Sequence, residues 1–256
     1  MTHNSLGRAL SFVGCKSKMC MILHSLLLNV VWIYITSFLS IAPLSLSAQS
    51  VVVDRGTFTL SIHGDRIGTE EFIIRRAGLG NEAAFISRGV VTRTLAATSE
   101  EFTTLLRVTA PEGMAAGYEF KSANPVPIEI MLNISGSRYF SRFISPQGQE
   151  EREFRAKNAT RIVEHQVAHH LYFLRNLKKG STVHVIEPRS RIDREFLVTD
   201  EQDEEIRIGR NHVTARRVIF LSSDGDRIVW FDMQGRVLRL EIPTTGYLAI
   251  REDLVG

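Results

Sequence analysis

Apolar and polar residues alternate along most of the chain after residue 51, and this pattern predicts a succession of short β-strands. Residues 57–62 alternate strictly, the turn-forming run His63-Gly64-Asp65-Arg66 follows, and residues 67–76 form the expected return strand of a hairpin. A period of two is typical of a strand with one buried face. Similar runs occupy residues 84–95, 102–109, 117–122, 127–134 and 139–144, with a weaker one at 150–156.

One stretch departs from this pattern. Its apolar residues recur at intervals of four, four, three and three, at Val163, Val167, Leu171, Leu174 and Leu177. This spacing predicts an α-helix over about residues 158–179 with one apolar stripe. Asn158 or Thr160 suits its first turn, the Lys178-Lys179 pair suits its last turn, and Gly180 suits a terminating left-handed position.

Strand-like runs resume after this helix, at residues 181–187, 192–198, 204–208, 212–221, 227–232, 236–242 and 247–251. The run Asp232-Met233-Gln234-Gly235 marks a hairpin, because glycine accepts a positive backbone angle. The chain therefore belongs to the mainly β class. We expect an antiparallel meander that forms a curved sheet or barrel with one packed α-helix at about 158–179, in a single domain of residues 51–256.

The first 50 residues differ from the rest. Met19 to Val53 contains no charged residue, Lys16 and Lys18 precede the apolar core, and Pro43 with several small residues follows it. This order is typical of a cleaved signal peptide, so we expect residues 1–50 to direct export to the periplasm. The alternative is an uncleaved anchor at residues 19–42 that holds the protein on the inner membrane.

Charge excludes one class of partner. The formal net charge of +3 comes from three basic residues in the first 50, and the remaining chain balances 28 acidic side chains with as many basic ones. A nucleic-acid partner is therefore not expected. Cys15 and Cys20 also lie in the first 50 residues, which leaves the body of the protein without a disulfide, a cysteine nucleophile or a thiolate metal site.

Histidines on the predicted helix form the strongest candidate for a metal site. His165 and His169 are four residues apart, so on an α-helix their imidazoles converge on one face. A third ligand would come from elsewhere, such as His184 or His63. The pattern is not His-Glu-x-x-His, and no Gly-x-Ser-x-Gly motif marks a hydrolase. We therefore expect no cofactor and keep a metal-dependent enzyme as an alternative.

The second half of the chain carries a set of features in a familiar order. The predicted helix ends in Leu171-Tyr172-Phe173-Leu174-Arg175-Asn176-Leu177, Lys179-Gly180 opens a strand, and the strands 228–232 and 235–241 follow. With Gly64-Asp65-Arg66-Ile67-Gly68 near the start, residues 55–252 resemble an uncharacterised family of exported, β-rich bacterial envelope proteins classed as domains of unknown function. The resemblance implies a periplasmic antiparallel fold and transfers no catalytic residue.

A helix packed on a curved sheet is also similar in architecture to periplasmic lipoprotein carriers, which hold acyl chains on the concave face. By this similarity we expect a non-enzymatic binding module for a lipid or another apolar small molecule. The ligand would contact helix residues facing the sheet, namely Val163, Val167, Leu171 and Leu174, with Phe173 at the margin. A core filled by these same side chains and a structural envelope scaffold are the alternatives. Membrane contact is expected only through an uncleaved N-terminal segment.

Overall fold

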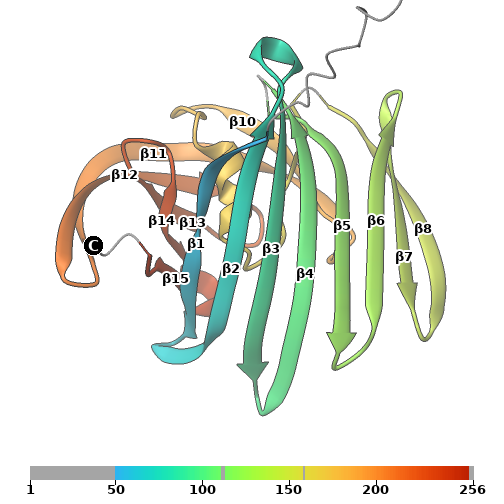
Figure 1. Cartoon of the computed structure of the whole chain (residues 1–256), viewed down its shortest axis with the longest axis horizontal. Helices are drawn as coiled ribbons and strands as arrows, with labels where there is room; N and C mark the ends of the chain where they lie inside the picture. Colours follow the sequence, from blue (N-terminus) through green and yellow to red (C-terminus); the bar gives the residue numbers. More distant parts are fainter. Residues whose placement is uncertain (1–49, 111–112, 158, 254–256) are drawn as a thin grey trace, which may run out of the picture. The chain divides into compact units, whose positions relative to one another are not determined.

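The computed structural model describes residues 50–110, 113–157 and 159–253, which form one curled β-sheet around a buried core (Figure 1). Residues 48–256 are a compact unit separate from residues 1–47. The expected signal peptide or anchor lies outside the described residues. The strands are β1 (Val51–Ile62), β2 (Asp65–Ala77), β3 (Ala84–Leu95), β4 (Thr98–Thr109), β5 (Ala115–Asn124), β6 (Ile128–Ser135), β7 (Arg138–Ser145), β8 (Gly148–Arg155), β9 (Arg161–Ile162), β10 (Thr182–Glu187), β11 (Ile192–Ile208), β12 (Asn211–Leu221), β13 (Arg227–Phe231), β14 (Val237–Ile242) and β15 (Tyr247–Arg251).

Strands that follow one another in the sequence are neighbours in the sheet, which confirms the predicted antiparallel meander. The order runs from β8 down to β1, then from β15 down to β9. The first and last strands meet in the middle, with Phe58 of β1 opposite Arg251 of β15. Only β9 and β10 pair in parallel among the described strands. The edge strands β8 and β9 do not pair with each other, so the curved sheet is not closed.

The curl brings the two halves of the sheet together. The Ala115 amide at the start of β5 donates to the Thr160 carbonyl beside β9, at 2.9 Å. An ion pair joins Arg191, in the turn before β11, to Glu150 of β8 at 2.5 Å, and the Arg152 guanidinium donates to the Arg191 carbonyl. These contacts join the two ends of the curled sheet, the end with β5 to β8 and the end with β9 to β11.

The concave face of the sheet carries the main core. Alternation places one set of side chains of each strand inside, for example Phe58 and Leu60 of β1, which are fully buried. Inward residues of the other strands complete one continuous apolar cluster, including Phe72, Val91, Phe102, Leu106, Tyr118, Phe120, Ile130, Leu132, Tyr139, Val185, Phe196, Phe220, Phe231 and Tyr247.

The predicted α-helix over residues 158–179 is wrong. That stretch begins as strand β9 and continues as turns, and its one helix is the 3-10 helix η2 (His169–Leu174). Its backbone bonds span three residues, as in Leu171 N to Ala168 O at 3.1 Å. Gln166, three residues before η2, has a φ of 59°, which an α-helix through this stretch would not contain. The other described helices are short 3-10 turns, η1 (Gly80–Glu82) and η3 (Pro243–Thr245). Among the described residues no helix has the length and apolarity to cross a membrane.

The predicted α-helix over residues 158–179 does not form because that segment lies inside the curled sheet. All six residues of η2 are buried, so it has no polar face for water. An amphipathic α-helix stabilises itself by putting one stripe inside and the other in solvent. Here the surrounding sheet buries every side, and side chains of the sheet take over part of the backbone bonding. We call residues 163–177 the plug.

A second, smaller apolar cluster lies on the convex face. Trp230 of β13 is 4% exposed there, and it packs with Ile206 and Ile208 of β11, Ala215 of β12 and Leu238 of β14. Its neighbour Phe231 points into the main core. The runs predicted as separate strands at 192–198 and 204–208 form one strand, β11. Its long hairpin with β12 bends over the convex face (Figure 1).

Candidate functional site

A buried carboxylate on the sheet anchors the plug. Glu70 of β2 is fully buried, and its Oε1 lies 2.7 Å from Nδ1 of His169. The same carboxylate accepts hydrogen bonds from the backbone amides of Ala168 at 2.9 Å and His169 at 2.8 Å. On the other side of the ring, Nε2 of His169 lies 3.4 Å from the Thr104 hydroxyl of β4. Three groups of the plug thus depend on one acid.

A glycine leaves the room for this histidine. Gly89 of β3 lies against the His169 ring, and a Cβ on Gly89 would stand 2.3 Å from the ring carbon Cε1. The ring of His169 also stacks on Phe72 of β2, with the ring centres 5.6 Å apart. His169 is therefore enclosed by β2, β3 and β4. That position is inaccessible to solvent and differs from the exposed helix face on which two histidines would have met.

The next histidine is buried among polar groups as well. His170 accepts a hydrogen bond at Nδ1 from the Glu164 amide at 3.1 Å, and its ring meets the edge of Tyr118 at 5.8 Å between centres. Burial, and secondarily the neighbouring His169, hold the pKa of His170 well below its usual range. Burial likewise raises the pKa of Glu164, against the opposing effect of Arg189. In both cases burial penalises the charged form of the side chain relative to water.

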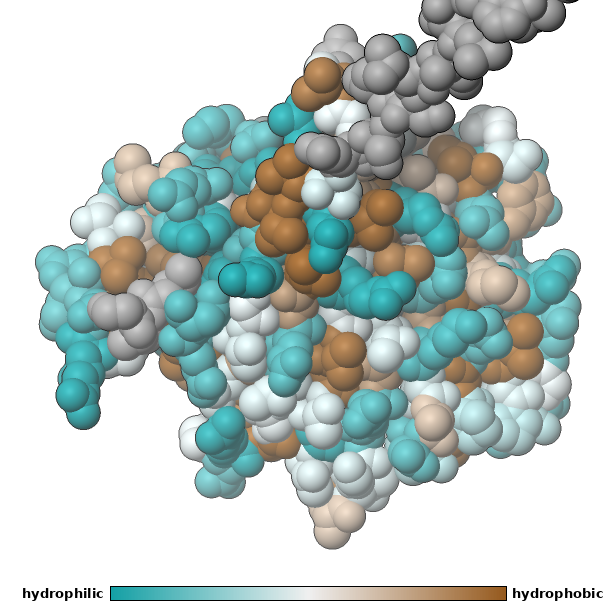
Figure 2. Space-filling view, viewed as in Figure 1, coloured by the Kyte–Doolittle hydropathy of each residue, from teal (hydrophilic) through white to brown (hydrophobic). Residues whose placement is uncertain are grey.

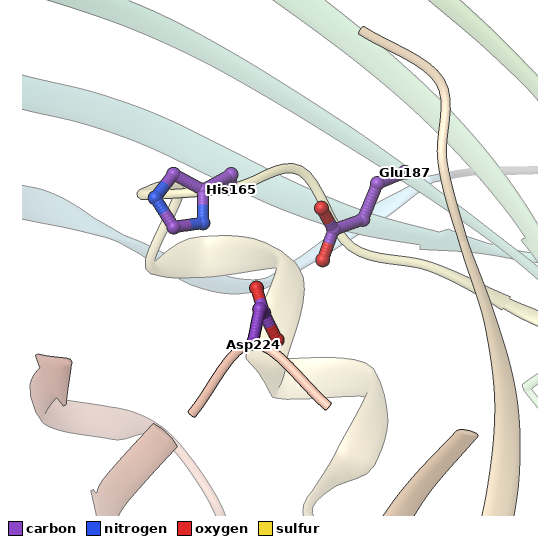
Figure 3. A group of neighbouring side chains, drawn as sticks. All are labelled: His165, Glu187 and Asp224. Carbon is purple, nitrogen blue, oxygen red and sulfur yellow. The ribbon is translucent and has the colours of Figure 1, made fainter. Parts of the chain in front are cut away.

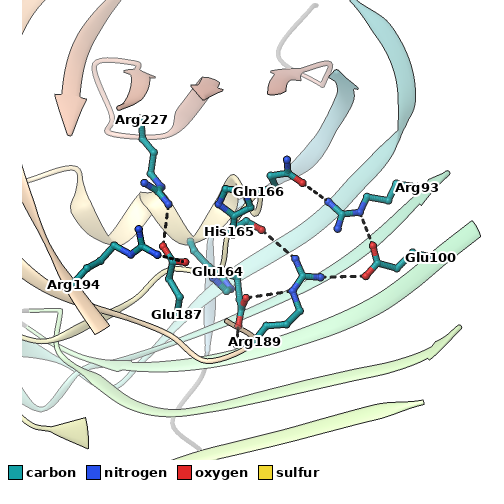
Figure 4. A network of polar contacts seen from close by, with 10 residues as sticks. Arg93, Glu100, Glu164, His165, Gln166, Glu187, Arg189, Arg194 and Arg227 are labelled. Atoms are coloured by element: carbon teal, nitrogen blue, oxygen red, sulfur yellow. Dashed lines mark hydrogen bonds and ion pairs between the residues drawn. The ribbon is translucent and has the colours of Figure 1, made fainter. Parts of the chain in front are cut away.

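A chain of ion pairs ties the beginning of the plug to the strands around it (Figure 4). Arg189 donates to Glu100 of β4 at 3.2 Å and lies 3.7 Å from the Glu164 carboxylate. Arg93 of β3 bonds both Glu100, at 2.7 Å, and the Gln166 side chain, at 2.8 Å. The bond to Arg93 helps to hold Gln166 in its left-handed backbone conformation.

A second group of charges continues the network toward the other half of the sheet. Glu187 of β10 is 1% exposed and pairs with Arg227 at 2.9 Å and Arg194 at 3.4 Å. Asp224 pairs with the same two arginines, at 3.0 Å with Arg227 and 2.5 Å with Arg194. Each carboxylate is thus compensated by guanidinium groups, as buried charges require.

His165 joins these two carboxylates in the one group of potential metal ligands among the described residues. Ligand atoms of His165, Glu187 and Asp224 lie within 4.8 Å of one another and point toward a common centre (Figure 3). Burial and then the charge of Arg227 lower the pKa of His165 to about 4, so its imidazole is neutral at pH 7. A neutral imidazole is a good ligand, but Arg194 and Arg227 already bind both acids, and a cation would have to displace them.

The His165–His169 metal pair, considered as an alternative from the sequence, is not assembled in this conformation. His165 belongs to this carboxylate group, whereas His169 is bound by Glu70 and Thr104. The two expected third ligands are elsewhere too: His184 bonds Asp193 at 2.7 Å, and His63 lies in the turn after β1, against Gly246. Without an α-helix, the spacing of four residues no longer places the two imidazoles on one face.

The residues expected to contact an apolar ligand fall into two sets. Four of them, Val163, Val167, Leu171 and Leu174, are at most 2% exposed and pack in the main core. Phe173 differs, because it borders an open pocket of about 200 Å³ at one end of the barrel-like sheet. Phe85, Gly113, Arg161, Arg175, Asn176 and Leu177 line the rest of this pocket, which we call the end pocket.

Arg175 gives the end pocket its charge. Its guanidinium lies 3.8 Å from the Tyr172 ring centre and donates to the Tyr172 carbonyl at 2.8 Å. It makes no ion pair with any carboxylate in the part of the chain that is described. Burial lowers the pKa of Arg175 from its usual value. Arg161 extends into the same pocket and bonds the Phe173 and Ala159 carbonyls.

Sequence patterns do not point to Glu70, Thr104 or Gly89, because they lie on three separate strands. The one signal in the sequence is Glu70 itself, an acid at a position of β2 where the alternation predicts an inward-facing apolar side chain. Arg175 was likewise missed, since the helix prediction left it on the polar face.

Comparisons with known proteins assign no activity to this chain. Neither a protein-family model nor a curated protein matches the chain. One similar solved structure is the crystal structure of a beta-barrel-like protein of domain of unknown function DUF1849 from Brucella abortus. It is 10% identical, with a TM-score of 0.48, and the match covers 77% of this chain and 94% of that one. Its description assigns no activity, and this similarity transfers none.

Proposed function

We propose that the protein is a non-enzymatic, exported protein of the bacterial envelope that binds an apolar or lipid-like ligand bearing an anionic group. The end pocket carries the proposal, since it is the place where an expected ligand residue, Phe173, borders open space between plug and sheet. Its apolar lining and its arginines suit opposite ends of such a molecule.

The chemistry of the lining supports an amphipathic ligand. Phe85, Phe173 and Leu177 offer an apolar surface to a hydrocarbon chain, and Arg175 offers a partly buried guanidinium without an ion-pair partner among the described residues. A carboxylate or phosphate pairs well with such a guanidinium. At about 200 Å³ the pocket is smaller than typical ligand sites of roughly 300–1,000 Å³, so it holds the end of a chain and its polar group.

Deeper binding requires the plug to move. Val163, Val167, Leu171 and Leu174 fill the core in this conformation and would meet a ligand only if the plug shifted. The 3-10 helix has few internal hydrogen bonds to break, and its main attachment is the Glu70 carboxylate. We keep these four residues as a proposed second part of the site.

Native mass spectrometry tests the proposal most directly. The unit of residues 48–256 is purified from the periplasm of its own organism, and its native mass is compared with the denatured mass. An additional mass that chloroform extracts is the expected result. A bare polypeptide in native conditions would contradict ligand binding and favour the scaffold alternative, in which the exposed edge of β8 joins a partner.

A fluorescent fatty acid such as cis-parinaric acid then locates the site. We expect Phe85→Ala and Arg175→Gln to weaken its binding about 5- to 100-fold each, the equivalent of about 1–3 kcal/mol. Phe140→Ala and Arg210→Gln are matched controls, since both side chains are exposed and lie outside the end pocket. Equal effects of all four variants would place the probe elsewhere and contradict the assigned pocket.

A metal-dependent enzyme remains the second candidate, favoured by the His165–Glu187–Asp224 group. Elemental analysis of the protein purified without chelators tests it. Stoichiometric zinc that is lost in His165→Ala and retained in His212→Ala, an exposed histidine, would support a metal centre. We expect no stoichiometric metal, because Arg194 and Arg227 already compensate both carboxylates.

A further inference from the structure

Arginines and aliphatic residues alternate in two dimensions on the convex face of β1–β4. In one row across the four strands, Val52 pairs with Arg75, Arg75 with Ile86, and Ile86 with Arg107. The next row reverses the order: Arg55 pairs with Ile73, Ile73 with Arg88, and Arg88 with Leu105. These eight residues form a checkerboard, which we call the arginine–aliphatic face.

The charge of this face is largely uncompensated. Arg55, Arg75 and Arg88 are exposed and make no ion pair within the described residues. Arg107 pairs with Glu119 of β5 at 2.6 Å. No acid belongs to either row on these four strands, and Glu71 lies in the row below, opposite Thr57. Elsewhere in the described chain most arginines have a carboxylate partner, so this concentration of free guanidinium groups is local.

The aliphatic side chains of this face are more exposed to solvent than aliphatic side chains usually are in folded proteins. Val52 is 41% and Ile86 39% exposed, and Ile73 and Leu105 are half-buried between arginines. At the same end of the strands, Val51 is 62% exposed and Leu79, in the loop between β2 and β3, is 86% exposed. That loop projects beyond the sheet (Figure 1), and apolar and hydrophilic residues lie side by side on this side of the molecule (Figure 2).

The path of the chain indicates what meets this face. Strand β1 starts at Val51, at the end of the sheet where the face lies. The alternative uncleaved anchor ends at residue 42, so the eight residues 43–50 separate it from Val51. A linker of this length reaches at most about 30 Å. With an uncleaved anchor, the face lies within that reach of the membrane.

We propose that the arginine–aliphatic face docks on the surface of an anionic lipid bilayer. Guanidinium groups bind lipid phosphates in pairs of hydrogen bonds, while the aliphatic side chains between them reach the boundary between headgroups and acyl chains. This surface adds a membrane contact in the folded domain to the one expected from the N-terminal segment. It does not rest on the proposed ligand, because the end pocket and this face share no residue.

Vesicle co-sedimentation of the unit of residues 48–256 tests the proposal. That unit contains the whole sheet and both apolar clusters, so it is complete without the N-terminal segment. We expect binding to phosphatidylcholine vesicles that contain phosphatidylglycerol and little binding to pure phosphatidylcholine. Binding should fall as salt is added, since Coulomb attraction at a surface is screened.

Two triple variants of equal charge separate the face from general electrostatics. Arg55→Gln with Arg75→Gln and Arg88→Gln should weaken binding about fivefold per arginine, from about 1 kcal/mol per basic residue at an anionic surface. The control triple, Arg66→Gln with Arg142→Gln and Arg210→Gln, removes three exposed arginines outside the face and should bind nearly as the parent does. Circular dichroism confirms that both remain folded.

Three results would overturn the proposal. Equal binding to neutral and anionic vesicles would remove the electrostatic basis, and equal loss in both triple variants would assign the binding to net charge. The third is a dimer in analytical ultracentrifugation that the first triple dissociates in the absence of lipid. That outcome would make a second copy of this chain the occupant of the face. Ligand binding in the end pocket is measured separately and can succeed or fail independently.

Discussion

The carboxylate of Glu70 binds three donors of the plug at once: the Nδ1 of His169 at 2.7 Å, and the backbone amides of Ala168 and His169. Glu70 and His169 are 99 residues apart in the sequence and are both fully buried. One side chain of the sheet therefore replaces part of the backbone bonding that an α-helix would have provided, and it fixes where the 3-10 helix begins.

Removal of this acid should destabilise the whole domain. Glu70→Ala leaves two buried amides and a buried imidazole without their acceptor, and we expect a loss of about 3–5 kcal/mol in the free energy of unfolding. Glu70→Gln keeps the shape but presents an amide NH₂ toward donors, and should cost about 1–3 kcal/mol. Urea unfolding followed by circular dichroism measures both. The neighbouring Glu71→Gln, on the exposed side of β2, should change stability by less than about 0.5 kcal/mol. An equal effect of Glu70→Gln and Glu71→Gln would contradict the anchoring role.

Gly89 should tolerate no side chain while His169 is present. Gly89→Ala places a Cβ 2.3 Å from the imidazole, and we expect a cost of about 1–3 kcal/mol as the ring or the strand shifts. Gly117→Ala is the matched control in β5, where the nearest atom lies at 3.4 Å. A double-mutant cycle with His169→Ala isolates the contact, because the alanine at position 89 should cost much less once the ring is gone. Additive costs in that cycle would show that the ring is not the obstacle.

Stability should fall in mild acid partly through His165. Its pKa is lowered to about 4 in the folded protein, chiefly by burial, against 6.5 in the unfolded chain. The unfolded state therefore binds the proton first, and the stabilisation present above pH 6.5 is lost as the pH falls from 6.5 to about 4. Since His165 is partly exposed, we expect about 1–2 kcal/mol from it.

The variant His165→Gln isolates this contribution. The raised pKa values of buried Glu164 and Glu187 act in the opposite sense, because these acids bind protons more readily when folded. They are present in both proteins and cancel in the comparison. Urea unfolding at pH 7 and pH 4.5 should show a smaller loss of stability for His165→Gln than for the parent. An identical loss in both would assign the acid sensitivity to other groups.

Trp230 should report on the β11–β12 hairpin. It is the one tryptophan of residues 48–256, and it is 4% exposed beneath Ile206, Ile208 and Ala215. Ile206→Ser should shift its fluorescence emission to longer wavelength and cost about 2 kcal/mol, since it uncovers a cluster separate from the main core. Leu221→Ser, at an exposed position of β12, should leave the emission unchanged. A red shift in both variants, or in neither, would contradict the covering role of the hairpin.

Local patterns in the sequence were enough for most of the strands, with β9 and the undivided β11 as exceptions. Alternation over residues 57–62 and 67–76 predicted the hairpin of β1 and β2, and the run Asp232 to Gly235 predicted the turn between β13 and β14, where Gly235 has a φ of 77°. In a strand with one buried face every second residue is apolar, and a short turn needs particular residue types. Both signals are complete within a few positions, so no distant contact is needed to interpret them.

In the plug, by contrast, local patterns did not suffice to predict the structure. Val163, Val167, Leu171 and Leu174 have the spacing of a helical stripe, and all four are buried as that pattern indicates. The same spacing says nothing of the polar residues between them, which an α-helix would expose and which this fold buries at His169 and His170. The partners of His169, Glu70 and Thr104, lie on β2 and β4, on either side of β3, and only the packing of the plug on the concave face brings them to the imidazole.

The end pocket and the arginine–aliphatic face could not be predicted from local patterns either. The sequence by itself determined a mainly β domain of consecutive antiparallel strands, because each strand carries its own pattern. Only the tertiary structure decided that Phe173 and Arg175 share an open pocket, and that Arg55, Arg75 and Arg88 share one face. Pairing register and the curvature of the sheet set those neighbours, and both are properties of the whole sheet, which no single strand contains.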